Sequence, residues 1–177
     1  MPGKLELVKK VTVSGTSTTV DITDVFSTKY INYMVTASDV LQAASSGASS
    51  LHVQLINSSG GVESTSGDYH TGFYQMRDDS AFFQGTDTTD TQMQIILGQI
   101  DDDDKGNGAV AYFYSPFASD TWTWVWTESS CVIGTQFRAL AGASMYIQEK
   151  SITGFRVALS ADGITQGTFC VYGIAEE

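Results

Sequence analysis

The feature that most constrains the fold of this chain is a hydrophobic pattern with a period of two residues. The clearest example runs from Thr121 to Thr127, where Trp122, Trp124 and Trp126 alternate with Thr or Val. Successive side chains of a β-strand point to opposite faces of a sheet, so this segment places all of its indoles on one face. The pattern predicts a strand and argues against an amphipathic helix, whose apolar residues recur every three to four positions.

Similar segments recur along the chain, separated by turn signals such as Ser59-Gly60-Gly61 and Gly106-Asn107-Gly108. The expected strands are Leu5–Val13, Thr18–Ile22, Tyr30–Thr36, Leu51–Ile56, Phe73–Arg77, Met93–Leu97, Ala109–Tyr114, Thr121–Glu128, Ile152–Leu159 and Gln166–Tyr172, with a less regular one within Phe137–Ile147. Val40–Ala44 is expected to form one short turn of helix. The sequence therefore predicts an all-β protein, an antiparallel jelly-roll-like β-sandwich of about nine to eleven strands. We expect a single domain over residues 1–177, whose first few residues form a loose arm.

The charge of the chain excludes several classes of partner. It has 20 acidic and 9 basic residues and a net charge of −11. Nucleic acids and anionic membrane surfaces repel such a field, so we expect no nucleic-acid partner and no membrane partner. No apolar run approaches the ~20 residues of a membrane span, and the first residues open no apolar run of the kind a signal peptide needs.

The residue types that carry most enzyme chemistry are scarce. His52 and His70 are the only histidines, and His52 falls on the polar face of an expected strand, as a surface residue does. No serine stands in a G-x-S-x-G elbow, and no pair of acids is singled out for glycosidase chemistry. Cys131 and Cys170 lack the spacing of a zinc site and are expected to be buried apolar residues, with one disulfide as the alternative. We therefore expect no enzymatic activity and no cofactor.

An acidic run, Asp101, Asp102, Asp103 and Asp104, is the sharpest charge feature. It falls between the expected strands Met93–Leu97 and Ala109–Tyr114, so it is predicted to form the solvated tip of a hairpin. Carboxylate oxygens are the ligands that Ca²⁺ prefers, which makes the run a weak candidate for a calcium site, although its spacing is not that of an EF-hand.

The three tryptophans have two possible roles. A buried indole face belongs to the core or to a subunit contact, whereas a solvated one is a ladder on which sugars stack. Thr121, Thr123 and Thr127 occupy the other face and are compatible with solvent, which favours packing or an interface for Trp122, Trp124 and Trp126 and leaves glycan stacking as the alternative.

A second set of aromatic residues lies in a region expected to be rich in loops. Its members are Tyr69, Phe73, Tyr74, Phe82 and Phe83. They serve either as a contact surface or to pin the loop to its scaffold, and the sequence does not choose between these roles.

The last segment of the chain resembles a known closing element. It contains Phe155-Arg156, a Gly163-Ile164 turn, Gly167-Thr168 and a terminal Tyr172-Gly173-Ile174. This order is similar to the closing hairpin of a family of tailed-bacteriophage virion proteins. The order of the earlier segments Thr19–Thr23, Lys29–Tyr33, Leu51–Leu55, Ser59–Gly61 and Asp68-Tyr69 is similar to that family as well.

The resemblance implies a jelly-roll-like β-sandwich that is often trimeric and that serves as a capsid decoration (cement) protein, a head fibre or a module of a tail fibre. The chain has no long N-terminal anchor and no coiled-coil stalk, which favours a decoration protein. We therefore expect a homotrimer on the capsid surface of the virion that binds the major capsid protein and stabilises the head by bridging capsomers. The alternative is a tail-fibre or receptor-binding module that recognises a glycan or protein of the host surface.

Overall fold

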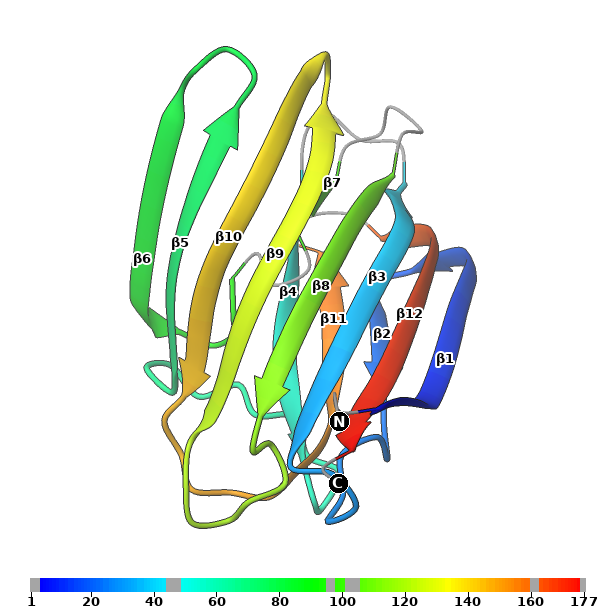
Figure 1. Ribbon diagram of the computed structural model, residues 1–177, viewed down its shortest axis with the longest axis vertical. Coiled ribbons are helices and arrows are strands. Elements are labelled where there is room, and N and C mark those ends of the chain that lie inside the picture. Colours follow the sequence, from blue (N-terminus) through cyan, green and yellow to red (C-terminus); the bar gives the residue numbers. More distant parts are fainter. Residues whose placement is uncertain (1–3, 44–48, 95–97, 101–105, 160–162, 176–177) are drawn as a thin grey trace.

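The computed structural model describes residues 4–43, 49–94, 98–100, 106–159 and 163–175. These residues form twelve strands and no helix, arranged in two antiparallel sheets (Figure 1). The strands are β1 (Lys4–Ser17), β2 (Thr19–Ile22), β3 (Asn32–Gln42), β4 (Ser49–Asn57), β5 (Tyr69–Arg77), β6 (Phe82–Asp90), β7 (Gln99–Ile100), β8 (Asn107–Tyr114), β9 (Thr123–Ile133), β10 (Gln136–Tyr146), β11 (Ile152–Leu159) and β12 (Ile164–Ala175). The prediction of an all-β, jelly-roll-like sandwich is confirmed.

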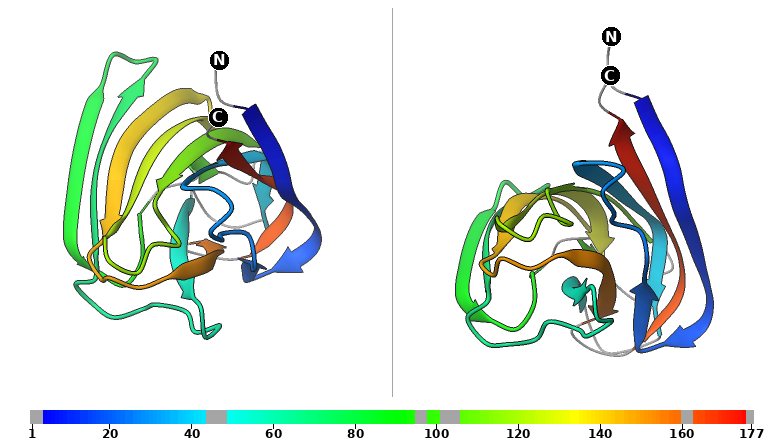
Figure 2. Two further views of the ribbon diagram at one scale, coloured as in Figure 1. Left: turned by 60° about the horizontal axis from the view of Figure 1, so that its bottom comes forward. Right: turned by 90° about the horizontal axis from the view of Figure 1, so that it is seen from below.

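The two sheets differ in size. The larger has eight strands in the order β1-β12-β3-β8-β9-β10-β5-β6, and the smaller has four in the order β2-β11-β4-β7. The larger sheet curves around the smaller one (Figure 2). We call the face of the larger sheet that points away from the smaller sheet its outer face, which is the face seen in Figure 1.

The core between the sheets is centred on three phenylalanines. Phe26 lies in the segment between β2 and β3, Phe113 on β8 and Phe155 on β11. The ring centroid of Phe155 is 5.9 Å from that of Phe26 and 5.5 Å from that of Phe113. Phe113 and Phe155 belong to different sheets, so these contacts join the two layers.

Two glycines shape the far side of the larger sheet, where β10, β5 and β6 pair. The Phe73 side chain of β5 lies opposite Gly142 of β10 and Gly85 of β6. A Cβ at Gly85 would lie 2.6 Å from the Phe73 ring, and one at Gly142 would lie 2.8 Å from the Phe73 Cβ. The absence of a side chain at Gly85 leaves room for the Phe73 ring, and its absence at Gly142 lets the backbone of β5 approach β10 closely.

The structure changes three of the expected elements. Of the expected strand Met93–Leu97, Met93 forms only an isolated bridge with Val53, and residues 95–97 lie outside the described residues. Val40–Gln42 belongs to β3 and is extended, so a helical turn from this point is wrong, since the pairing of β3 with β12 continues to Gln42. Phe82–Asp90 forms strand β6, although a loop-rich region was expected there. β6 is largely exposed along its whole length, so its sequence carries no alternation of apolar and polar residues.

Two pairs of consecutive strands lie in different sheets, although hairpins are expected there from the sequence. β11 pairs with β2 and β4 in the smaller sheet, whereas β12 pairs with β1 and β3 in the larger one, so Ile152–Ile174 is not a hairpin. β7 and β8, the strands before and after the acidic run, likewise lie in different sheets. Asp101, Asp102, Asp103 and Asp104 themselves lie outside the described residues.

Candidate ligand-binding face

The three tryptophans lie on the outer face of the larger sheet. Trp122, Trp124 and Trp126 are 39 %, 48 % and 38 % exposed, while Thr123 and Val125 between them are buried. The prediction that the indoles pack in the core is therefore wrong. The two other roles, in an interface or in ligand binding, remain. The alternation correctly predicts two faces, but Thr and Val are small and β-branched and fit the space beneath β9.

The tryptophans have apolar neighbours on both adjoining strands. Trp124 lies opposite Tyr114 of β8 and Met145 of β10, and Trp126 lies opposite Ala143 of β10. Directly opposed side chains on one face of a sheet contact one another, so the indoles belong to a continuous apolar surface.

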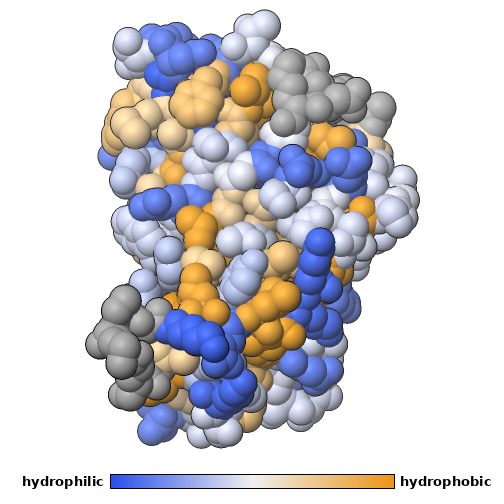
Figure 3. All heavy atoms as spheres, turned by 45° about the vertical axis from the view of Figure 1, so that its right-hand side comes forward, coloured by the Kyte–Doolittle hydropathy of each residue, from blue (hydrophilic) through white to orange (hydrophobic). Residues whose placement is uncertain are grey.

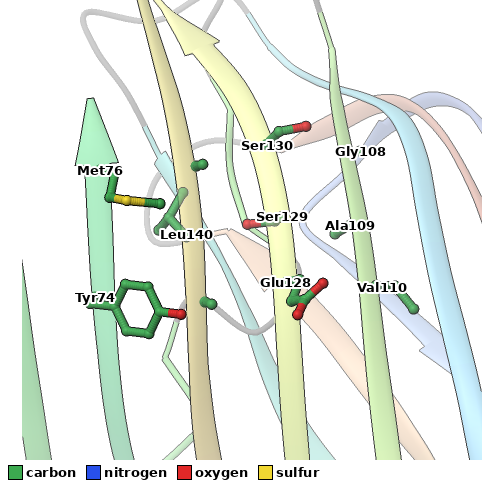
Figure 4. A pocket seen from close by; sticks show the side chains of 11 residues that line it. Tyr74, Met76, Gly108, Ala109, Val110, Glu128, Ser129, Ser130 and Leu140 are labelled. Carbon is green, nitrogen blue, oxygen red and sulfur yellow. The ribbon is translucent and has the colours of Figure 1, made fainter. Parts of the chain in front are cut away.

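A groove runs along β10 on this face. The outward side chains of β10 include Ala139, Ala141 and Ala143, which are small, while Trp126 on β9 and Tyr74 on β5 rise on either side. Figure 4 shows Tyr74 extending from β5 toward β10. The small side chains form the floor of the groove and the aromatic side chains form its walls.

The groove consists of three neighbouring hollows of about 460, 560 and 320 Å³. The first and second share Tyr74, and the second and third share Gly72, Thr86 and Ala143. The first hollow is the one in Figure 4, and the third ends at Trp124 and His70. Together they follow β10 from Ala139 to Met145, a distance of about 20 Å at the rise of an extended strand.

Polar side chains lie at intervals along the groove. They include Glu128, Ser130, Gln84, Thr86, Thr88 and His70, from β9, β6 and β5. Among the described residues that line the three hollows there is one carboxylate and no lysine or arginine. The absence of enzymatic activity stays a prediction; among the described lining residues, Glu128 has no second carboxylate beside it.

The second aromatic set divides between the two faces of β5 and β6. Tyr74 and Phe82 lie on the outer face with their ring centroids 6.0 Å apart and nearly parallel. Phe83 lies on the inner face beneath the Arg77 guanidinium, at 4.1 Å, and Tyr69 is buried in the core. These residues therefore do both things that the sequence left open, since Phe73, Tyr74 and Phe82 line the second hollow and Tyr69 packs in the core.

Exposed apolar side chains continue across the outer face to the opposite edge of the larger sheet. Tyr114 is 41 % exposed, and Leu5 and Leu7 on the edge strand β1 are 47 % and 59 % exposed. Figure 3 shows hydrophobic side chains at the surface among hydrophilic ones on the side of the molecule where β1 and β12 lie. Exposed apolar surface of this extent marks a place where a ligand or a partner binds.

The histidines and cysteines do not form a common site. His52 is 4 % exposed, so its expected surface position is wrong: the segment that contains Met93 pairs with Val53 and covers β4. Burial lowers the pKa of the His52 imidazole, against the opposing charge of Asp90. Cys131 on β9 and Cys170 on β12 are not joined by a disulfide.

Within the described ranges, no group of three or more His, Cys, Asp or Glu side chains is arranged to hold a metal ion. The acidic run that was the weak calcium candidate is not part of those ranges. The described residues also contain no helix able to cross a membrane.

Comparison with known proteins gives likeness in fold only. No protein-family model and no curated protein matches the chain. Alginate lyase Aly36B is 11 % identical with a TM-score of 0.36 over 93 % of this chain and 78 % of that chain. Sheep galectin-11 in complex with glycerol is 10 % identical with a TM-score of 0.29, over 88 % of this chain and 98 % of that chain. The CBM40 of the Ruminococcus gnavus IT-sialidase, bound to α2,3 sialyllactose, is 8 % identical with a TM-score of 0.30, over 97 % of this chain and 95 % of that chain. Likeness at this level carries no conclusion about function.

Proposed function

We propose that this protein is a structural module of a bacteriophage virion that attaches to carbohydrate of the host surface through the groove along β10. The virion assignment depends on the resemblance of the segments from Thr19 to Ile174 to the family of tailed-bacteriophage virion proteins. The attachment role depends on one observation, the exposure of the Trp124 and Trp126 indoles beside the groove. Indoles exposed in the single chain suit a subunit contact as well as a ligand, and the groove beside them supports the receptor-binding alternative.

The chemistry of the groove suits a sugar. The C–H face of a pyranose ring is apolar and slightly positive, and it stacks on the negative face of an aromatic ring. Trp124, Trp126 and Tyr74 offer such rings, and hydroxyl, amide and carboxylate groups beside them can bind the hydroxyls of a sugar.

A glycan array tests this proposal. The wild-type protein should bind at least one capsular or lipopolysaccharide glycan of a bacterial surface, and Trp126→Ala should lower its affinity at least about tenfold, or ~1.4 kcal/mol. Because these indoles are partly exposed, Trp124→Ala and Trp126→Ala should change the free energy of unfolding by no more than about 1 kcal/mol. An array on which the wild type binds nothing would refute the attachment role.

Capsid decoration is the second candidate, and one observation favours it. The exposed apolar surface extends past the groove to Leu5 and Leu7 at the far edge of the sheet. A sugar chain in the groove leaves that half uncovered, whereas a protein partner would bury it.

The decoration role predicts that the chain forms a homotrimer and binds capsids that lack it. In analytical ultracentrifugation, a trimer that dissociates on a Leu7→Glu substitution would support this role, because a charge cannot be buried in an apolar contact without a large penalty. A persistent monomer that does not bind capsids would refute it.

A further inference from the structure

We infer that the groove along β10 takes an uncharged polysaccharide, bound lengthwise as an extended chain, and excludes acidic polysaccharides. This inference depends on the proposed attachment role and specifies its ligand. It comes from the shape of the groove, its charge and the placement of its polar groups.

The shape determines how a chain lies. The three hollows are open to solvent and follow one another along β10, so they accommodate several consecutive sugar units and need no chain end. The floor of Ala139, Ala141 and Ala143 holds the groove open, because any longer side chain at these positions would fill it.

The charge determines the class of sugar. Glu128 is the only charged side chain among the described residues that line the hollows, and its carboxylate is exposed to the groove. The chain as a whole carries a net charge of −11. A uronate or sialate placed here would meet a like charge and no lysine or arginine, so repulsion opposes its binding.

The polar groups suit hydroxyls. Glu128 accepts hydrogen bonds, and Ser130, Gln84 and Thr86 both donate and accept them. They are spread over all three hollows rather than gathered at one point, as binding along a chain of repeated hydroxyl-bearing units requires.

Affinity electrophoresis in gels that contain one polysaccharide each tests this inference. The neutral probes are β-1,3-glucan, β-1,4-glucan, galactan and mannan, and the acidic probes are alginate and hyaluronate. We expect retardation by at least one neutral probe and by neither acidic one. Retardation should change less than about twofold between about 50 mM and 500 mM salt, since screening does not act on an uncharged ligand.

Variants locate the binding. Ala143→Leu, which fills the floor where the second and third hollows meet, should reduce the affinity for the neutral probe at least about tenfold. Trp122→Ala is the matched control, because Trp122 is as exposed as Trp126 but lines none of the hollows, and it should leave the affinity unchanged. Glu128→Lys should create salt-sensitive binding of alginate.

The outcomes separate this inference from the attachment role. Salt-sensitive retardation of the wild type by alginate or hyaluronate overturns the inference and leaves the attachment role standing. Neutral binding that Ala143→Leu and Trp122→Ala weaken equally also overturns it, because the ligand then lies across the tryptophans and outside the groove. Absence of binding on both the glycan array and all of these gels overturns both.

Discussion

Replacing Phe155 by Ala should lower the free energy of unfolding by about 3–5 kcal/mol, as is typical of a buried phenylalanine. The side chain is fully buried, and its ring packs against Phe26 and Phe113. Phe155 is on the smaller sheet and Phe113 on the larger one, so the cavity would open at the contact that holds the two layers together. Chemical denaturation followed by tryptophan fluorescence and by far-UV circular dichroism measures the change.

Phe137→Ala is the matched control for this substitution. The Phe137 side chain is 49 % exposed on β10, so the same change of residue should alter the free energy of unfolding by less than about 1 kcal/mol. Equal effects of the two substitutions would contradict a core centred on the three phenylalanines.

The sequence predicts the strands well wherever one face of a strand is buried. The alternation of Trp122–Thr127 identifies both β9 and the side chains that share a face. It does not say which face points inward, because both faces bear residues that can be buried. That choice depends on the neighbouring strands, where the outward row contains Ala139, Ala141 and Ala143 and leaves a groove that no pattern within β9 reveals.

The features that the sequence misses depend on contacts between distant segments. β6 has no alternation because it lies at an edge of the larger sheet with most of its side chains in solvent. His52 looks like a surface residue on its strand, but the segment around Met93 covers it. β11 and β12 lie in different sheets, but in the sequence they resemble a hairpin. Two strand segments separated by a few residues are the pattern of both arrangements.

A buried carboxylate near the end of the sandwich holds the connection between β4 and β5 in place. Glu63 is 7 % exposed, and its Oε1 accepts a hydrogen bond from Asn57 Nδ2 at 2.7 Å while its Oε2 lies 2.9 Å from Lys150 Nζ. The Glu63 carbonyl accepts a hydrogen bond from the Tyr69 hydroxyl, and the Tyr69 hydroxyl accepts one from the Leu55 amide. Burial by itself raises the pKa of the Glu63 carboxyl, but the hydrogen bonds from Asn57 and Lys150 and the charge of Lys150 together lower it below its ordinary value of 4.5.

Glu63→Gln should therefore lower the free energy of unfolding at pH 7 by about 1–3 kcal/mol, because the amide leaves Lys150 without its partner and places a donor beside it. A carboxyl whose pKa is depressed in the folded state stabilises the protein above its unfolded pKa, and this contribution is lost as the pH falls through the folded pKa. The difference between the wild type and Glu63→Gln should thus be full at pH 7, should begin to shrink as the pH falls toward 4.5, and should be lost once the pH has passed through the lower folded pKa, where the carboxyl is neutral in both states. Denaturant titrations at a series of pH values measure it.

Asp21→Asn provides the contrast, because Asp21 also binds a cation, Arg156, but on the exposed face of the smaller sheet. Solvent screens that pair, so its loss should change the free energy of unfolding by less than about 1 kcal/mol at any pH. If the two substitutions destabilise the protein equally, burial of Glu63 adds nothing to its pairing. If the effect of Glu63→Gln does not shrink as the pH falls through the titration of the carboxyl, the charge of the carboxylate is not what holds the connection.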